Sequence, residues 1–332
     1  NDKGQGPAWA NSLFEDNAEY GYGMHVGAKT VRRTLAADII KALANGVDKS
    51  LEPAMKEWLD GMDETTGSRA RAAKLAKAVK PFENDPGLKG IARKSHLFVK
   101  HSNWVFGGDG WAYDIGFGGL DHVLASGENI NVMVFDTEVY SNTGGQSSKA
   151  TPTGAIAKFA ASGKQVKKKD LGMMMISYGY VYVAQVAIGA DRNQALKAIR
   201  EAEAYDGPSL IIGYAPCVNH GIKSGMGFSQ RQAKRAVDAG YWALYRYNPD
   251  LKSDGSNPFS LDSVPPKSDF NEFLMSEVRY ASLMQQDPDT AGQLFEKARF
   301  EALERIEQYR RLGRLFQEPP NEKDSCDQTD KI

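Results

Sequence analysis

The segment from Gly107 to Gln146 constrains the fold of this chain more than any other part of its 332 residues. A short apolar run at 103–106 leads into the glycine-rich turn GGDG at 107–110, where glycines let the backbone bend sharply and approach a ligand. A helical pattern follows over 113–126, and the apolar run at 130–135 is typical of a strand buried on both faces. The segment is therefore predicted to form a strand, a helix and a second strand.

Oxygen donors gather at the ends of these two predicted strands. A right-handed crossover makes such strands parallel and adjacent, so Asp109 and residues 136–139 are expected to be neighbours at one edge of the sheet. Magnesium prefers hard oxygen ligands and is commonly shared between protein and phosphate. The Asp109 carboxylate, the Thr137 hydroxyl and the Val139 carbonyl are suitable ligands. The pattern therefore indicates a site for a divalent metal and a diphosphate.

The alternation of helices and strands continues beyond this unit. Helices are predicted at 152–160, 170–177 and 193–205, and strands at 181–187 and 209–214. Repeated strand and helix segments of this kind are typical of an α/β fold with a doubly wound, mostly parallel sheet. We expect flanking helices at both the N-terminal and the C-terminal side of that sheet.

The domain organisation follows from shifts in composition and periodicity. The predicted parts are an ordered loop at 1–27, a cofactor-binding α/β domain at 28–247 with a helical excursion at 28–80, a loop with C-terminal helices at 248–317, and a mobile tail at 318–332. The chain opens at Asn1 without a methionine, in a glycine-rich segment. We therefore expect a piece of a longer polypeptide.

Bulk composition narrows the class of protein. A formal net charge of -1 gives no general electrostatic footprint for nucleic acid. The lysine-rich run at 164–169 is interpreted as a solvated turn or helix start, with docking of an acidic carrier protein as the alternative. No run approaches the roughly 18 apolar residues that cross a membrane. The two cysteines, Cys217 and Cys326, give no disulfide framework. A soluble cytoplasmic protein is predicted.

Longer motifs add a family resemblance. The GDG turn at 108–110, with its second part DTEVYSNTGGQ at 136–146, resembles the signature of thiamine diphosphate enzymes. The second part is most similar to that of pyruvate:ferredoxin (flavodoxin) oxidoreductases, and Thr137 stands where most thiamine enzymes have Asn. The resemblance extends from SLFEDNAEYGYGM at 12–24 to NHGIKSGM at 219–226. It implies that this chain is the C-terminal, thiamine diphosphate-binding region of such an enzyme.

The resemblance also assigns roles to individual residues. It implies that Asp109, Thr137 and Val139 bind Mg2+, and that Gly108, Gly110 and Trp111 line the diphosphate. It places Asn142 near the thiazolium and the substrate, although a turn of this composition would also account for Asn142. The N-terminal segment would lie against the cofactor through Phe14, Glu15, Asn17 and Glu19, for which packing in a loop is the equal alternative.

A cysteine completes the implied site. Cys217 lies after a predicted strand in a PCxxHG motif, where the resemblance implies one thiolate ligand of a 4Fe-4S cluster. Such clusters normally need four thiolates, so the other ligands would lie outside this chain. A lone cysteine is otherwise most often a small buried apolar residue. His220, in the same motif, could tune that cluster or contact substrate, but a hydrogen bond to the backbone is the favoured interpretation.

The implied activity is oxidative decarboxylation of pyruvate to acetyl-CoA and CO2, with electrons passing through 4Fe-4S clusters to ferredoxin or flavodoxin. Partners would be pyruvate, coenzyme A, the remaining domains of the enzyme and a second copy in a homodimer. Two other functions stay open at this point. One is a non-oxidative thiamine diphosphate-dependent 2-oxo acid decarboxylase or carboligase, and the other is a non-catalytic interaction module.

Overall fold

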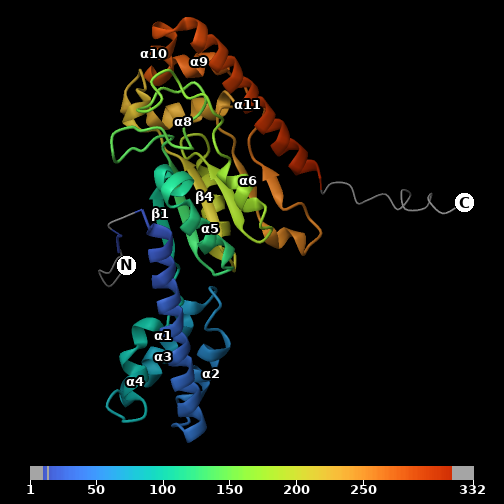
Figure 1. The fold of residues 1–332 in the computed structure, drawn as a ribbon. Helices are drawn as coiled ribbons and strands as arrows, with labels where there is room; N and C mark the ends of the chain where they lie inside the picture. The colour runs from blue at the N-terminus through green and yellow to red at the C-terminus, as the bar shows by residue number, and fades with distance from the viewer. Residues whose placement is uncertain (1–9, 13–14, 316–332) are drawn as a thin grey trace, which may run out of the picture. The chain divides into compact units, whose positions relative to one another are not determined.

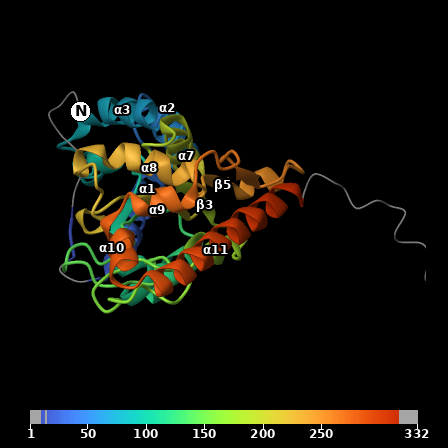
Figure 2. The same ribbon diagram turned by 90° about the horizontal axis from the view of Figure 1, so that it is seen from above.

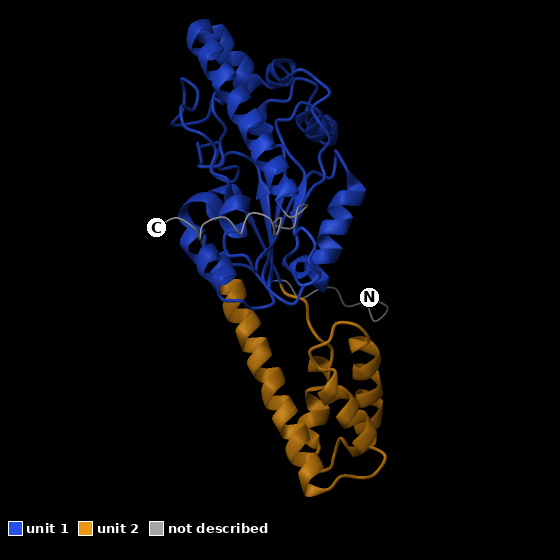
Figure 3. Ribbon diagram, turned by 90° about the vertical axis from the view of Figure 1, so that its right-hand side faces the viewer, with its two compact units in different colours: residues 1–19, 104–332 blue, residues 20–103 orange. Residues whose placement is uncertain are grey.

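The computed structural model describes residues 10–12 and 15–315. Phe14, Cys326 and the predicted tail at 318–332 lie outside these residues. The chain divides into two compact units, Asn1–Glu19 together with Trp104–Ile332, and Tyr20–Asn103 (Figure 3). Among the described residues, no helix combines the length and the apolar character needed to span a membrane.

The larger unit is built on a six-stranded, mostly parallel sheet (Figure 1). Its strand order is β1-β2-β4-β3-β5-β6. The strands are β1 Trp104–Gly108, β2 Asn131–Asp136, β3 Tyr182–Val186, β4 Ser209–Tyr214, β5 Tyr245–Tyr247 and β6 Phe259–Leu261. The first four pair in parallel, whereas β5 and β6 add an antiparallel edge. Strands β3 and β4 are buried along their whole length, as expected for the apolar interior of an α/β fold. The predicted fold class is confirmed.

Helices flank this sheet. They are the π-helical turn η3 Gly110–Ile115, α5 Phe117–Ala125, α6 Leu171–Ile176, α7 Arg192–Ala204, α8 Ser229–Asp238, α9 Phe270–Met275, α10 Val278–Gln286 and α11 Pro288–Arg314. Aspartate side chains cap the start of two of these helices. Asp191 accepts hydrogen bonds from backbone N–H groups at the start of α7, and Asp287 accepts one at the start of α11. Helices α9, α10 and α11 pack against one another (Figure 2).

The helix predicted at 152–160 is wrong. This segment forms turns and isolated backbone bridges, with Gly154 N bonded to Lys164 O and Lys164 N bonded to Ala155 O. Gly154 and Phe159 have φ angles of 81° and 65°, which lie in the left-handed region and interrupt a right-handed helix. The segments predicted at 170–177 and 193–205 do form helices, α6 and α7.

The N-terminal segment also differs from its prediction as a loop over 1–27. Helix α1, Asn17–Asn45, begins inside that range. Glycines obscured its period, and two of its buried positions are polar, so the apolar pattern was incomplete. The buried positions that reveal the helical spacing are Ala18, His25, Arg32, Leu35 and Ile39.

The smaller unit, Tyr20–Asn103, has its own core. It contains most of α1 with α2 Glu52–Asp60, α3 Ser68–Val79 and α4 Lys89–Arg93, and its apolar cluster is drawn from residues between 35 and 99. Trp58 is buried there and donates a 2.8 Å hydrogen bond to Phe98 O. The buried Arg32 donates to the carbonyls of Leu97 and Met62. This unit is longer at both ends than the helical excursion predicted at 28–80.

Candidate functional site

Strands β1 and β2 end side by side, and this brings the predicted metal ligands together. Gly108 pairs with Phe135 in register, so the residues after both strands emerge at one edge of the sheet. The Thr137 hydroxyl donates to Asp109 Oδ1 at 2.6 Å and lies 3.0 Å from Val139 O. The structure therefore places Asp109, Thr137 and Val139 in one cluster of oxygen atoms.

The spacing of this cluster fits a magnesium ion. Ligands on neighbouring corners of a magnesium octahedron lie about 3 Å apart, because each Mg–O bond is about 2.1 Å long. The distances of 2.6 and 3.0 Å around Thr137 Oγ1 are of that size. Among the described residues, no group of three or more His, Cys, Asp or Glu side chains could hold a metal. This donor set instead combines one carboxylate with a hydroxyl and a carbonyl.

Asp109 is buried, and both of its side-chain hydrogen-bond partners among the described residues are hydroxyls. Only 1% of its surface is exposed, and its two carboxylate oxygens accept from the hydroxyls of Thr137 and Ser148, each at 2.6 Å. Burial, reinforced by the nearby Asp136 carboxylate, raises the pKa of Asp109 to about 6 although these hydroxyls oppose the shift. A bound cation would therefore stabilise the ionised form of this buried carboxylate.

A cleft of about 860 Å³ opens beside Asp109. The predicted cofactor residues that line it are Gly108, Asp109, Gly110, Trp111, Thr137 and Asn142. A Cβ on Gly108 would meet nothing within 4 Å, whereas a Cβ on Gly110 would lie 2.3 Å from the Tyr140 ring. Phe106 and Phe135 also line the cleft, stacked with their ring centroids 6.1 Å apart. The cleft thus joins an apolar wall to the oxygen cluster.

The remaining predicted residues on the N-terminal segment also belong to this region. Glu15 and Asn17 line the cleft, and Asn17 Nδ2 donates to Phe106 O at 3.3 Å. Glu19 packs on α5, where a Cβ on Gly119 would lie 1.8 Å from its carboxylate. Asn142 is exposed on the turn that follows the predicted metal ligands.

The Cys217 segment follows β4 and contacts the same edge of the sheet. Cys217 is a free, partly exposed thiol whose sulfur accepts from Asn219 Nδ2 at 3.4 Å. The buried His220 places Nε2 2.8 Å from Thr137 O, so the histidine bonds to the backbone of the loop that carries the predicted metal ligands. Gly145, in the turn after that loop, lies so close that a Cβ there would be 2.8 Å from Asn219 Oδ1.

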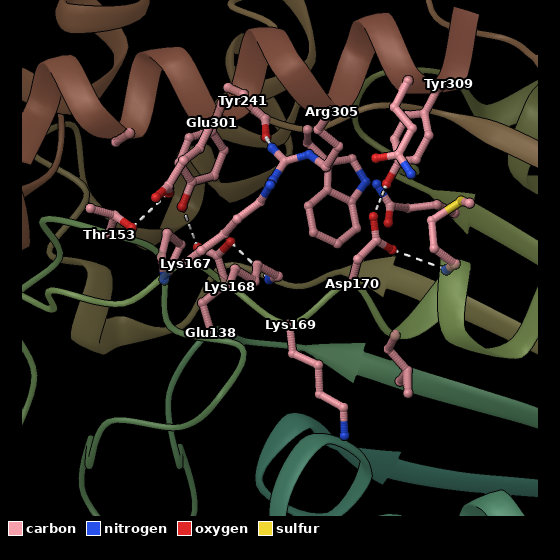
Figure 4. A pocket seen from close by; sticks show the side chains of 18 of the residues that line it. Glu138, Thr153, Lys167, Lys168, Lys169, Asp170, Tyr241, Glu301, Arg305 and Tyr309 are labelled. Carbon is pink, nitrogen blue, oxygen red and sulfur yellow. Dashed lines mark hydrogen bonds and ion pairs between the residues drawn. The ribbon is translucent and has the colours of Figure 1, made fainter. Parts of the chain in front are cut away.

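A buried network of charges lies beneath the oxygen cluster, and sequence reasoning missed it. Lys168 Nζ is 2.7 Å from Asp136 Oδ2 and 3.2 Å from Glu138 Oε1. Glu138 Oε2 accepts from Arg279 Nη2 at 2.7 Å and from Tyr241 OH at 2.6 Å. Burial opposes ionisation of Glu138, but Lys168 and Arg279 outweigh it and lower its pKa to about 2. Glu138 and Lys168 line a second pocket together with Tyr241, Glu301 and Tyr309 (Figure 4).

Some of these missed residues had a signal in the sequence. Asp136 and Glu138 alternate with Thr137 at the end of an apolar strand, and this pattern places their charges on the opposite side from Thr137. Ser148 follows the motif closely and could have been proposed as a partner of Asp109. Arg279 carried no such signal, because 141 residues separate it from Glu138.

This chain matches a family model over part of its length and known oxidoreductases over most of its length. Residues 86–212 match the family model "Thiamine pyrophosphate enzyme, C-terminal TPP binding domain". The chain is 59% identical to a pyruvate-flavodoxin oxidoreductase of Klebsiella pneumoniae and 57% identical to a pyruvate:ferredoxin oxidoreductase of Moorella thermoacetica. Each alignment covers 94% of this chain and 27% of the relative, so the chain spans about a quarter of their length. A solved 2-oxoglutarate:ferredoxin oxidoreductase from Magnetococcus marinus aligns with a TM-score of 0.34 and 24% identity, covering 38% of this chain and 44% of that one.

Proposed function

We propose that this chain is the part of a pyruvate:ferredoxin (flavodoxin) oxidoreductase that holds thiamine diphosphate, because it is similar to such enzymes over most of its length and contains a match to a thiamine pyrophosphate-binding domain. The observation that carries the proposal is the convergence of Asp109, Thr137 and Val139 within hydrogen-bonding distance, beside a cleft that Asp109 and Thr137 line. A buried carboxylate, a hydroxyl and a carbonyl form the protein half of a magnesium site, and a diphosphate supplies the rest.

In this proposal each side chain has a distinct task. Asp109, Thr137 and Val139 hold Mg2+, while Gly108 leaves the open space into which a diphosphate fits. Thiamine diphosphate, when bound, supplies the carbon nucleophile and electron sink that decarboxylation of a 2-oxo acid requires. The remaining cofactor contacts come from Gly110, Trp111 and Asn142.

We further propose that Cys217 is one ligand of a 4Fe-4S cluster. Its thiol is partly exposed, and its segment contacts the metal-ligand loop through His220 and Thr137. The other ligands would come from outside this chain, because a cluster of this type normally takes four thiolates. The arrangement is suited to passing electrons from the thiamine site toward ferredoxin or flavodoxin.

The overall reaction proposed for the whole protein is oxidation of pyruvate and coenzyme A to acetyl-CoA and CO2. This chain represents about a quarter of the length of its relatives, so the reaction also depends on the remaining domains. A homodimer in the cytoplasm completes the proposal, and that part rests on the family relationship alone.

Calorimetric titration of the intact protein with thiamine diphosphate, with and without Mg2+, tests the proposal. Binding should require Mg2+ and disappear in an Asp109→Ala variant. Asp206→Ala is the matched control, because Asp206 is an exposed aspartate whose carboxylate bonds to Asn129. Binding that survives Asp109→Ala, or that is absent from the folded wild-type protein, would contradict the assignment.

A further inference from the structure

The two metal ligands on the loop after β2 are separated by a residue in an unusual backbone conformation. Within the described residues, two residues other than glycine have a positive φ: Glu138 at 59° and Phe159 at 65°. The left-handed region is disfavoured for residues with a Cβ, because the Cβ approaches the following carbonyl oxygen. Some contact must therefore keep Glu138 in that conformation.

The conformation of Glu138 turns neighbouring groups to opposite sides of the loop. Its own side chain enters the interior, where Glu138 is 1% exposed. The Thr137 hydroxyl and the Val139 carbonyl meet on the cleft side, 3.0 Å apart and next to Asp109. The left-handed conformation of Glu138 therefore lets the Thr137 hydroxyl and the Val139 carbonyl, on either side of it in the sequence, face the same point.

Several contacts fix the Glu138 side chain and backbone. Arg279 Nη2 and the Tyr241 hydroxyl contact the same oxygen, Glu138 Oε2, at 2.7 and 2.6 Å. Arg279 is itself held by Glu277 at 2.8 Å, and both are buried. The Thr151 hydroxyl donates to Glu138 O at 2.5 Å. Helix α10 thus supplies a rigid anchor for a loop that lies far from it in the sequence.

We propose that Glu138 is a positioning residue for the metal site. Its carboxylate, fixed by Arg279 and Tyr241, keeps the loop in the left-handed conformation that brings Thr137 and Val139 together. This inference rests on the proposed function, since it concerns how the metal ligands are arranged. The competing explanation is that the same ion pairs stabilise only the fold, as buried ion pairs do in many proteins.

Two substitutions at one position separate these explanations. Glu138→Ala removes the anchor and keeps a Cβ, whereas Glu138→Gly removes the anchor but accepts a positive φ freely. The probe is Mn2+ with thiamine diphosphate, and binding to the intact protein is measured from the electron paramagnetic resonance signal of free Mn2+. Phe159→Ala and Phe159→Gly are the matched controls, because Phe159 also has a positive φ but is 92% exposed.

Glu138→Ala should weaken Mn2+ binding by about tenfold, which is the size of effect expected from the cost of a left-handed residue with a Cβ. The Mn2+ affinity of Glu138→Gly should remain within about threefold of wild type. Both Phe159 variants should bind as wild type does. Equal losses in Glu138→Ala and Glu138→Gly, with both proteins folded, would overturn the inference because a role in the fold alone gives glycine no advantage.

The wild-type protein and Asp109→Ala keep this test separate from the proposed function. If the wild type binds Mn2+ with thiamine diphosphate and Asp109→Ala does not, the site is established and the Glu138 result decides the inference alone. If the folded wild type does not bind, the proposed function fails and the inference fails with it. Should Glu138→Ala not fold, Glu138→Gln retains the side-chain length and should still weaken binding by about threefold, and unchanged affinity would refute the inference.

Discussion

Replacing Asp109 with asparagine should stabilise the metal-free chain. A pKa of about 6 in place of 3.8 means that the ionised carboxylate costs the fold on the order of 3 kcal/mol at pH values well above 6. Asparagine has no charge to desolvate, but it loses one of the two hydroxyl hydrogen bonds at this position, worth about 1 kcal/mol. The Asp109→Asn variant should therefore be more stable than wild type by about 2 kcal/mol at pH 8.

The pH dependence of this difference has a definite sign. The pKa of Asp109 is raised in the folded chain, so the folded state keeps a proton that the unfolded state releases between pH 3.8 and about 6. Wild type should lose stability relative to Asp109→Asn as the pH rises through that window, and the difference should be constant above it. At pH 4 the two proteins should be about equally stable, or the variant slightly less stable.

Urea unfolding in buffer with a metal chelator measures these differences. Hydrogen exchange of peptides from β1 and β2 should report the transition, because the chain has two compact units and a global signal would mix them. Adding Mg2+ and thiamine diphosphate should reverse the order, since only wild type gains stability from the ligand. An Asp109→Asn variant that is less stable than wild type at pH 8, or a difference that does not change with pH, would refute the reasoning.

Three further predictions concern single side chains around the cleft. Thr137→Val keeps the side-chain shape but removes the hydroxyl that lies between Asp109 and Val139. Calorimetry should show that Mg2+-dependent binding of thiamine diphosphate is weakened by about tenfold. The circular dichroism spectrum of the variant should match that of wild type. Ser148→Ala removes a hydrogen bond to the Asp109 carboxylate and should raise the pKa of Asp109 further. Titrations at a series of pH values should therefore show that the variant loses more Mg2+ affinity at pH 6.5 than at pH 8. Cys217→Ser in the intact protein should lower its iron content by about four atoms per chain while thiamine diphosphate binding is unchanged, and unaltered iron would contradict the cluster assignment.

The part of the site that could be predicted from the sequence depends on sheet topology. A right-handed crossover makes β1 and β2 adjacent, so the neighbourhood of Asp109 and Thr137 follows from one apolar pattern and one turn. The anchor of Glu138 could not be predicted in this way, because an ion pair with Arg279 across 141 residues leaves no periodicity in the chain.

The errors in the predicted elements have local causes. The segment at 152–160 has the composition of a helix start, yet Gly154 and Phe159 adopt left-handed conformations. The backbone of this segment bonds instead to Gly145, Ser147 and Lys164. The start of α1 was missed because glycines interrupt its apolar pattern and because the polar His25 occupies a buried position there.

The order of strands gives the spacing of the two proposed cofactors a physical origin. Asp109, Thr137 and Cys217 follow β1, β2 and β4, which are consecutive neighbours in the sheet. Adjacent strands lie about 4.8 Å apart, so β1 and β4 are separated by about 10 Å whatever side chains surround them. The spacing between the backbone positions that precede the proposed metal ligands and the proposed cluster ligand is therefore set by backbone hydrogen bonds. Substitutions in the flanking helices should leave that spacing unchanged.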